Sequence, residues 1–283
     1  MGITIKKTFT AIALLALSCV HPAMAADNSV YISQAGNSTT VIMTQDGAGN
    51  VIRGIQNVGG SNTTPALITG NANTVTTDQI GTGNTLDLGL QTSIQNGSSG
   101  GNQFSYHVYG NNSRAVIDSN NSGVNTSASN TVSVTQTGDF SYANVNVLGA
   151  LNTITATTTG GNNNRLISTV NGNNNNQTIN VSGGGYNNVT VYQGMGGSAI
   201  PQSLQDMPLP ENVNNHGTVT LTVTGASNTV NISQAGSINT TVANINGSGN
   251  TANIVQSGIA GNTTVNLAST GNGNTFNITS LAH

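Results

Sequence analysis

The sequence repeats one short pattern along most of its length, and this repeat limits the folds that the chain can adopt. In the stretch NTVNISQAGSINTTVANINGSGNTANIVQSG, residues 228–258, an asparagine returns every eleven residues. Apolar residues follow it at two-residue spacing, and a glycine stands eight residues after it. A unit of this length cannot bury an apolar face alone, so the repeat predicts an architecture of stacked units.

The same asparagine-to-glycine spacing occurs ten times along the chain. The pairs are Asn28/Gly36, Asn73/Gly81, Asn102/Gly110, Asn130/Gly138, Asn152/Gly160, Asn164/Gly172, Asn176/Gly184, Asn228/Gly236, Asn239/Gly247 and Asn250/Gly258. In five of the pairs the sixth residue after the asparagine is a glutamine, namely Gln34, Gln79, Gln136, Gln234 and Gln256. The abundance of Asn and Gly does not account for this added glutamine, and we interpret the pairs as one repeat.

The residues between asparagine and glutamine alternate between two faces. Val230 and Ile232 share the face of Asn228, whereas Thr229 and Asn231 lie on the other face. Alternation of period two with β-branched residues on one face is typical of a half-buried strand of about six or seven residues. The glycine and the residues after it are suited to a tight turn with positive φ.

These features predict an all-β fold, a β-solenoid of strand–turn–strand coils with about 22 residues in each coil and about ten coils. Stacking places Asn on Asn and Gln on Gln, so that interior amides form cross-β-like hydrogen-bonded ladders. Stacked like charges would repel, which agrees with a charged fraction of only 5%. The residues predicted to form the ladders and turns are Asn28, Gln34, Gly36, Gln79, Gly81, Gln136, Gly138, Asn228, Gln234, Gly236, Asn239, Asn250, Gln256 and Gly258.

The repeat is interrupted by a segment rich in proline, residues 194–217. It shows no alternation, and proline is excluded from central strands because it cannot donate a ladder hydrogen bond. We expect a loop or linker there, between a solenoid block at 26–193 and a C-terminal solenoid block at 218–283. Shorter irregular segments are expected at 63–70, 84–101 and 119–129.

The first 25 residues have the features of a secretory signal peptide. Lys6 and Lys7 precede an apolar run at 11–20, and Ala23-Met24-Ala25 fits a signal-peptidase site, which predicts cleavage after Ala25. An alternative is a lipoprotein signal with Cys19 acylated. The apolar run is too short to span a bilayer and no other segment could, so we expect a secreted protein that does not span a membrane. Cleavage after Ala25 leaves no cysteine and therefore no disulfide.

The charges argue against several classes of function. From residue 26 onward three arginines stand against eight acidic residues, a net charge of −5, which disfavours nucleic acid and anionic membranes as partners. The acidic residues are scattered singly and we interpret them as solvated, although an alignment of Asp78 with Asp87 across coils stays open. The histidines lack metal-ligand spacing. We therefore expect no enzyme activity, no metal and no cofactor.

The repeat resembles the curlin repeat, which runs Ser, five residues, Gln-x-Gly-x-x-Asn-x-Ala, three residues, Gln. Asn228 stands where the family has Ser, and Gln234, Gly236 and Asn239 follow at the family spacing. The stretch NTANIVQ, residues 250–256, matches the second half of the repeat. Together with the signal peptide, these residues make the chain similar to the curlin family of secreted bacterial amyloid subunits, most clearly over residues 228–258.

This resemblance implies a structural function. A curlin-like chain passes through the periplasm and an outer-membrane export machinery, then polymerises outside the cell into amyloid fibres of the biofilm matrix that support surface adhesion. Its partners would be other copies of itself and a nucleator subunit. The alternative from the residues is a monomeric secreted β-solenoid adhesin that binds a carbohydrate or a surface through the 194–217 loop.

Overall fold

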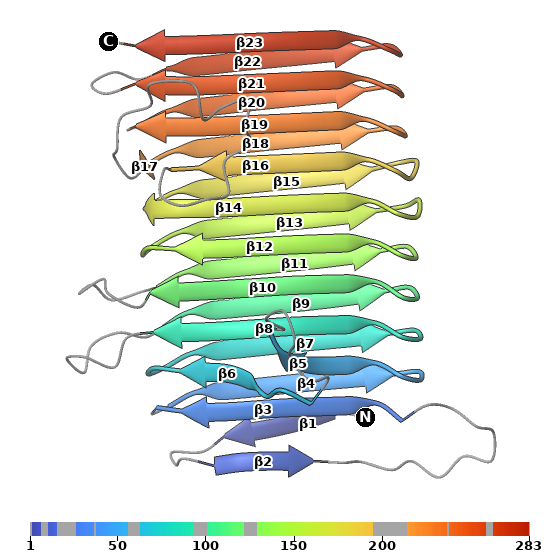
Figure 1. Ribbon diagram of the computed structural model, residues 1–283, viewed down its shortest axis with the longest axis vertical. Helices are drawn as coiled ribbons and strands as arrows, with labels where there is room; N and C mark the ends of the chain where they lie inside the picture. Colours follow the sequence, from blue (N-terminus) through green and yellow to red (C-terminus); the bar gives the residue numbers. More distant parts are fainter. Residues whose placement is uncertain are drawn as a thin grey trace.

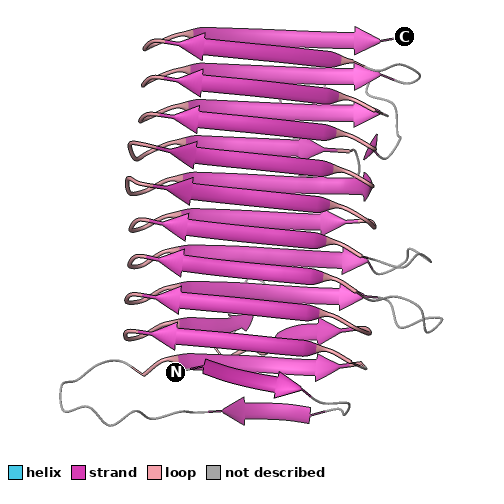
Figure 2. Cartoon of the chain, turned by 180° about the vertical axis from the view of Figure 1, so that it is seen from behind, coloured by secondary structure: helices cyan, strands magenta, loops and turns pink. Residues whose placement is uncertain are grey.

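The protein forms a flattened column of stacked β-strands (Figure 1). The computed structural model describes residues 2–6, 11–15, 27–36, 38–55, 63–92, 101–121, 129–194, 214–236, 238–258 and 263–282. All secondary structure in these residues is β-strand, and it lies in two sheets that face each other along the column (Figures 1 and 2). The predicted all-β fold is therefore confirmed.

The two sheets contain ten and thirteen strands. Sheet A consists, in spatial order, of β1 (Gly2–Lys6), β4 (Thr40–Asp46), β7 (Thr74–Ile80), β9 (Gln103–Tyr109), β11 (Thr131–Thr137), β13 (Thr153–Thr159), β15 (Asn176–Ser182), β18 (Thr218–Thr224), β20 (Thr240–Asn246) and β22 (Thr264–Thr270). Sheet B consists of β2 (Ala11–Leu15), β3 (Ser29–Ala35), β5 (Val51–Gly54), β6 (Ala66–Thr69), β8 (Thr85–Thr92), β10 (Arg114–Asn121), β12 (Tyr142–Leu148), β14 (Arg165–Asn173), β16 (Asn188–Gln193), β17 (Asn214–Asn215), β19 (Thr229–Gly236), β21 (Thr251–Gly258) and β23 (Thr275–Ala282).

One strand of sheet B, a turn and one strand of sheet A make a coil of the solenoid. From β3 onward every strand pairs in parallel with its equivalent in the next coil. The pairing keeps the repeat in register: Thr229 of β19 lies opposite Thr251 of β21, and Gln234 lies opposite Gln256. The predicted solenoid with a coil of about 22 residues is confirmed, and longer connections lengthen some coils.

The core is the thin space between the two sheets. Inward side chains alternate with outward ones along each strand, so that in β11 Val132, Val134 and Gln136 are buried and Ser133 and Thr135 between them are not. Burying one such aliphatic side chain stabilises the fold by about 1.5–3 kcal/mol. The largest fully buried aliphatic side chains are Ile52, Ile68, Leu86, Leu88, Leu90, Ile117, Ile154, Leu166, Ile179, Leu221 and Ile232.

The two edges of the column differ in their connections. From β4 onward, each sheet-A strand is joined to the next sheet-B strand by a turn of four or five residues, and these turns stack on the right in Figure 1. The longer connections all follow strands of sheet B. Most of the predicted 194–217 loop, at 195–213, lies outside the described residues. The strands on both sides of it pair directly, β15 with β18 and β16 with β19, so the two predicted blocks share one stack.

Two segments that the sequence predicted to be irregular contain strands. The segment 84–101 begins with β8, whose Leu86, Leu88 and Leu90 are buried, and the segment 63–70 contains β6. The alternation of β8 is difficult to recognise in the sequence because its outward positions include Asp87 and Gly89. β6 is difficult to recognise because it has only four residues and follows Pro65. In the segment 119–129, β10 continues to Asn121 and residues 122–128 lie outside the described part of the chain.

The N-terminal strands are the exception to parallel pairing. β1 lies antiparallel to β4, and β2 lies antiparallel to β3. Both belong to the predicted signal segment, and they cover the sheet edges of the first coil (Figure 1). Among the described residues, no helix has the length and hydropathy needed to cross a membrane.

Candidate functional site

A ladder of asparagine and serine side chains follows the edge with the short turns. We name it the first ladder, and it consists of the residues that precede the sheet-B strands, Asn28, Asn50, Asn84, Ser113, Ser141, Asn164, Asn187, Asn228, Asn250 and Asn274. The Asn228 backbone N–H donates to Asn187 Oδ1 over 3.0 Å, and Asn228 Oδ1 accepts the backbone N–H of Asn250 over 2.9 Å. Asn228 Nδ2 donates to the Gly247 carbonyl over 2.8 Å. The side chain is fully buried, and coils on both sides satisfy it.

A second ladder follows the opposite edge. It consists of the residues that precede the sheet-A strands, Thr39, Asn73, Asn102, Asn130, Asn152, Asn175, Gly217, Asn239 and Thr263. Asn152 Oδ1 accepts the backbone N–H of Asn175 over 2.9 Å, and the Asn152 backbone N–H donates to Asn130 Oδ1 over 2.9 Å. In both ladders the later coil gives the backbone donor and the earlier coil gives the side-chain acceptor. The ladders therefore have a direction along the column.

Glutamines form shorter ladders inside the two sheets. In sheet B, Gln193 Nε2 donates to Gln234 Oε1 over 2.9 Å, and Gln234 Nε2 donates to Gln256 Oε1 over 2.8 Å. In sheet A, Gln45 Nε2 donates to Gln79 Oε1 over 2.7 Å. Three successive glutamines in sheet B show how the interior accepts polar side chains when equivalent positions repeat.

Gln136 has a different partner from the other glutamines. Its Oε1 accepts a hydrogen bond of 2.9 Å from the hydroxyl of Tyr106, a fully buried residue of the preceding sheet-A strand. Burial raises the pKa of the Tyr106 phenol. At this coil the neutral Tyr106 hydroxyl and the neutral Gln136 amide thus take the place of a glutamine pair, and no charge is placed in the core.

The turn glycines let neighbouring coils approach at backbone distance. Gly81 has a φ of 116°, and a Cβ at this position would lie 2.0 Å from the Gly110 carbonyl oxygen of the next coil. Only a residue without a side chain fits there. Gly36, Gly138 and Gly236 also have positive φ, whereas Gly258 lies in β21 opposite Ala282 of β23.

The remaining predicted residues lie at different points of the same ladders. Asn28 starts the first ladder and is half-buried; its Oδ1 accepts the Asn50 backbone N–H over 2.9 Å. Gln34 lies in β3, and its Nε2 is buried without a hydrogen-bond partner in the described part of the structure. Asn239 is fully buried in the second ladder and Asn250 is buried in the first. No observation tests a role of these residues in self-assembly, which stays a prediction.

One asparagine of the predicted repeat is out of register. The pair Asn176/Gly184 put Asn176 at the ladder position, but Asn175 occupies that position and Asn176 is exposed. Residues 173–176 are four consecutive asparagines, so the spacing alone cannot select one of them. Buried Ile179 and Val181 fix the register, because one-residue slippage would turn both to solvent.

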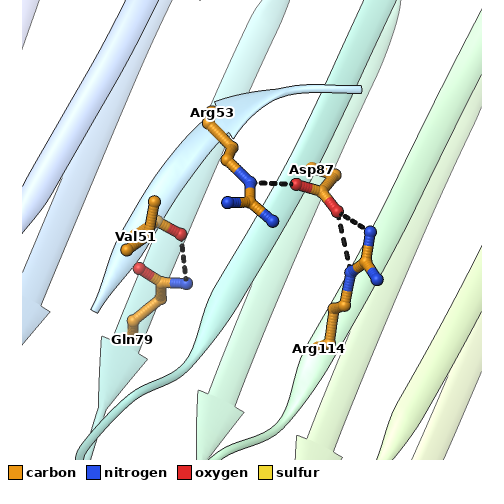
Figure 3. Close-up of polar contacts among 5 residues, drawn as sticks. All are labelled: Val51, Arg53, Gln79, Asp87 and Arg114. Carbon is orange, nitrogen blue, oxygen red and sulfur yellow. Dashed lines mark hydrogen bonds and ion pairs between the residues drawn. The ribbon is translucent and has the colours of Figure 1, made fainter. Parts of the chain in front are cut away.

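Sequence reasoning missed a row of charged side chains on the outer face of sheet B. Asp87 of β8 is fully buried between two arginines of neighbouring strands (Figure 3). Arg53 Nε lies 2.6 Å from Asp87 Oδ1, and Arg114 Nε lies 2.8 Å from Asp87 Oδ2. The interpretation of Asp87 as a solvated acid is wrong. A signal was present, because Arg53 and Asp87 are each the third residue after an asparagine of the first ladder.

Two other outward carboxylates are not assembled into a catalytic pair. Asp78 lies on sheet A, where Tyr109 donates to its Oδ2 over 3.4 Å and His107 Nδ1 lies 4.0 Å from the same oxygen. It is not aligned with Asp87, which lies on sheet B. Asp118 of β10 is half-buried, and desolvation raises its pKa. Within the described residues, no group of three or more His, Cys, Asp or Glu could hold a metal ion.

The C-terminal end of the column presents open sheet edges. β22 pairs with β20 and β23 pairs with β21, and no described residue pairs with their other edges. The inward Ile254 of β21 is 1% exposed, whereas its equivalent Ile278 of β23 is only half-buried. An open edge with unpaired backbone groups and incompletely covered apolar side chains is a template for another strand.

The comparisons with known proteins add no relative. No family model, no curated protein and no solved structure matches this chain. The fold and the ladders therefore define the class to which the protein can be assigned, a β-solenoid with polar interior ladders and an open terminal edge.

Proposed function

We propose that this chain is a structural subunit of extracellular, curli-like amyloid fibres that contribute to a biofilm matrix and to surface adhesion. The observation that carries the proposal is the open edge of β22 and β23 at one end of a regular parallel stack. A further strand added there gains the same backbone hydrogen bonds and ladder contacts that every interior coil has. Growth by end-to-end stacking follows, and the chain performs no chemical step.

The open edge of β22 and β23 also indicates the partners of the chain. The principal partner is another copy of the chain, because its strands have the alternation and ladder residues that the open edge lacks. Secretion through the periplasm and an outer-membrane export machinery, with loss of residues 1–25, is part of the proposal, as is a nucleator subunit that starts the fibre. Loss of residues 1–25 would remove β1 and β2 and would expose the edges of β4 and β3 at the other end.

The test is polymerisation of the chain of residues 26–283. The chain is diluted from denaturant into buffer and followed by Thioflavin T fluorescence, electron microscopy and fibre diffraction. We expect a lag phase and then unbranched fibres with a meridional spacing of about 4.8 Å. A β-rich chain that remains monomeric at all concentrations would contradict the proposal and would support the alternative of a secreted adhesin that binds through the 194–217 loop.

A further inference from the structure

The number of strands in the stack differs between the two sheets. From β4 to β22, sheet A has nine strands along the column. From β3 to β23, sheet B has ten levels, because two levels hold two strands each: β5 and β6 both pair with β3 and with β8, and β16 and β17 both pair with β14. The described strands beyond the predicted signal segment therefore end on a half coil, with one more level in sheet B than in sheet A.

This half coil restricts how two copies can stack. If the next copy keeps the same orientation, its β3 lies on β23 and continues sheet B. Its β4 then lies two levels above β22, and one level of sheet A is vacant at each junction. The vacancy would leave the outer edge of β22 unpaired between the two copies, and unpaired backbone groups enclosed in this way are costly.

A half-turn about the long axis removes the vacancy. Strands of sheets A and B run in opposite directions, so a half-turn exchanges both the positions of the sheets and their directions, and the strands of the next copy remain parallel to those below. β3 of the next copy then lies on β22, and β4 lies on β23. We propose that copies of the chain of residues 26–283 assemble head to tail with a half-turn between successive subunits. This inference rests on the proposed function.

The residues at the junction fit this arrangement. Counted from the ladder positions Asn28 and Thr263, the inward residues of β3 and β22 fall on the same levels: Val30 over Val265, Ile32 over Leu267 and Gln34 over Ser269. The Gln34 Nε2, which lacks a partner in the described part of the structure, would meet the Ser269 hydroxyl. The direction of the ladders favours head-to-tail contact, because the terminal Asn274 offers Oδ1 to the backbone N–H of an incoming strand.

Pairs of introduced cysteines distinguish the two orientations. Tyr31, Asn266 and Asn277 are outward and are each the third residue after a ladder position, in β3, β22 and β23. With a half-turn, position 31 of the next copy lies about 4.8 Å from position 266 of the copy before it, within the range for a disulfide. Without the half-turn, position 31 lies over position 277 instead. The chain of residues 26–283 has no other cysteine.

The experiment compares two double variants assembled into fibres and then oxidised. We expect Tyr31→Cys/Asn266→Cys to give a ladder of covalent oligomers on a denaturing gel and Tyr31→Cys/Asn277→Cys to give monomer. Asn253→Cys/Asn277→Cys is the control for the oxidation, because these residues are partners within one chain and should crosslink without forming oligomers.

The outcomes separate this inference from the proposed function. Oligomers from the 31/277 pair, or fibres in which neither pair forms oligomers while the control pair oxidises, would overturn the half-turn but not the fibre. Absence of fibres from the unsubstituted chain would overturn the proposed function and with it this inference. If only the cysteine variants fail to assemble, the subunit rise in unsubstituted fibres decides: about 46 Å with the half-turn against about 48 Å without it.

Discussion

Each buried amide of this molecule is stabilised by its equivalent in the next coil. An isolated Gln or Asn side chain in a core carries unpaired donors and acceptors, which cost roughly 1–3 kcal/mol each. Here Gln234 donates to Gln256 and accepts from Gln193, and both neighbours are buried as well. Repetition of one residue type at one position is therefore the physical condition that allows a polar interior.

Replacement of Gln234 by leucine tests this condition. Gln234→Leu keeps the approximate volume but removes the acceptor of Gln193 Nε2 and the donor to Gln256, so we expect a loss of about 2 kcal/mol in the free energy of unfolding. Urea denaturation of the monomer, followed by far-UV circular dichroism, measures this loss. Gln103→Leu, at an exposed position of β9, is the matched control and should change stability by less than about 0.5 kcal/mol. Equal stability of both variants would contradict the ladder account.

The approach of the turns makes a second prediction at the residue scale. Gly81→Ala places a Cβ 2.0 Å from the Gly110 carbonyl oxygen, so we expect a loss of at least about 2 kcal/mol and a lower unfolding midpoint. Gly273→Ala is the control, because its φ is also positive but no atom lies within 4 Å of the added Cβ. Its loss should be only the roughly 1–2 kcal/mol of backbone strain. A larger loss at 273 than at 81 would show that strain, and not close packing of coils, requires glycine.

Strands of the stack were predictable where the alternation is unbroken. β11, β19 and β21 follow directly from the asparagine and the two-residue spacing, because one buried face repeats in each coil. The coil length followed as well, since two such strands and two turns fill it. The ladder positions Asn228, Asn239 and Asn250 were predicted by the same spacing and are buried.

Other elements could not be predicted because local sequence does not determine them. β6 has four residues and is held between β3 and β8, which are distant in sequence. Asn175 was confused with Asn176 because only the burial of the following residues selects the register. The burial of Asp87 depends on Arg53 and Arg114 from neighbouring coils, so it follows from the alignment of the ladder positions across coils and not from the residues next to Asp87.

The outer face of β10 makes a prediction about pH. Desolvation raises the pKa of Asp118 above its ordinary value of 3.8, so the folded state favours the neutral carboxyl. Its contribution to stability is complete below the unfolded pKa and is lost as the pH rises through the folded pKa. We therefore expect Asp118→Asn to raise the urea midpoint at neutral pH and to leave it unchanged below about pH 3. Asp46→Asn, at an exposed position of β4, is the control; a stability gain for Asp118→Asn that is independent of pH would contradict desolvation as the cause.

At the scale of the whole molecule, the stack has no natural limit along its axis. Each interior coil contacts only its two neighbours, so stability grows by one coil and one interface at a time. Both ladders and both sheets end at β22 and β23 with the same groups that are paired in every interior coil. A column of this kind differs from a globular core, which closes on itself. Its ends are the surfaces at which a second copy would form the most backbone hydrogen bonds and ladder contacts.

The parity of the strands predicts how a shortened chain should assemble. A chain of residues 26–270 lacks β23 and has nine levels in each sheet, so copies can stack without rotation and without a vacancy. β3 of the next copy would then lie on β21, and Tyr31→Cys would face Asn253→Cys, the third residue after Asn250. We expect this pair to give covalent oligomers in oxidised fibres of the shortened chain, with a subunit rise of about 43 Å. In the chain of residues 26–283 the same pair should give none, because β23 covers β21. Oligomers from Tyr31→Cys/Asn266→Cys in the shortened chain would show that rotation between copies does not depend on the number of strands.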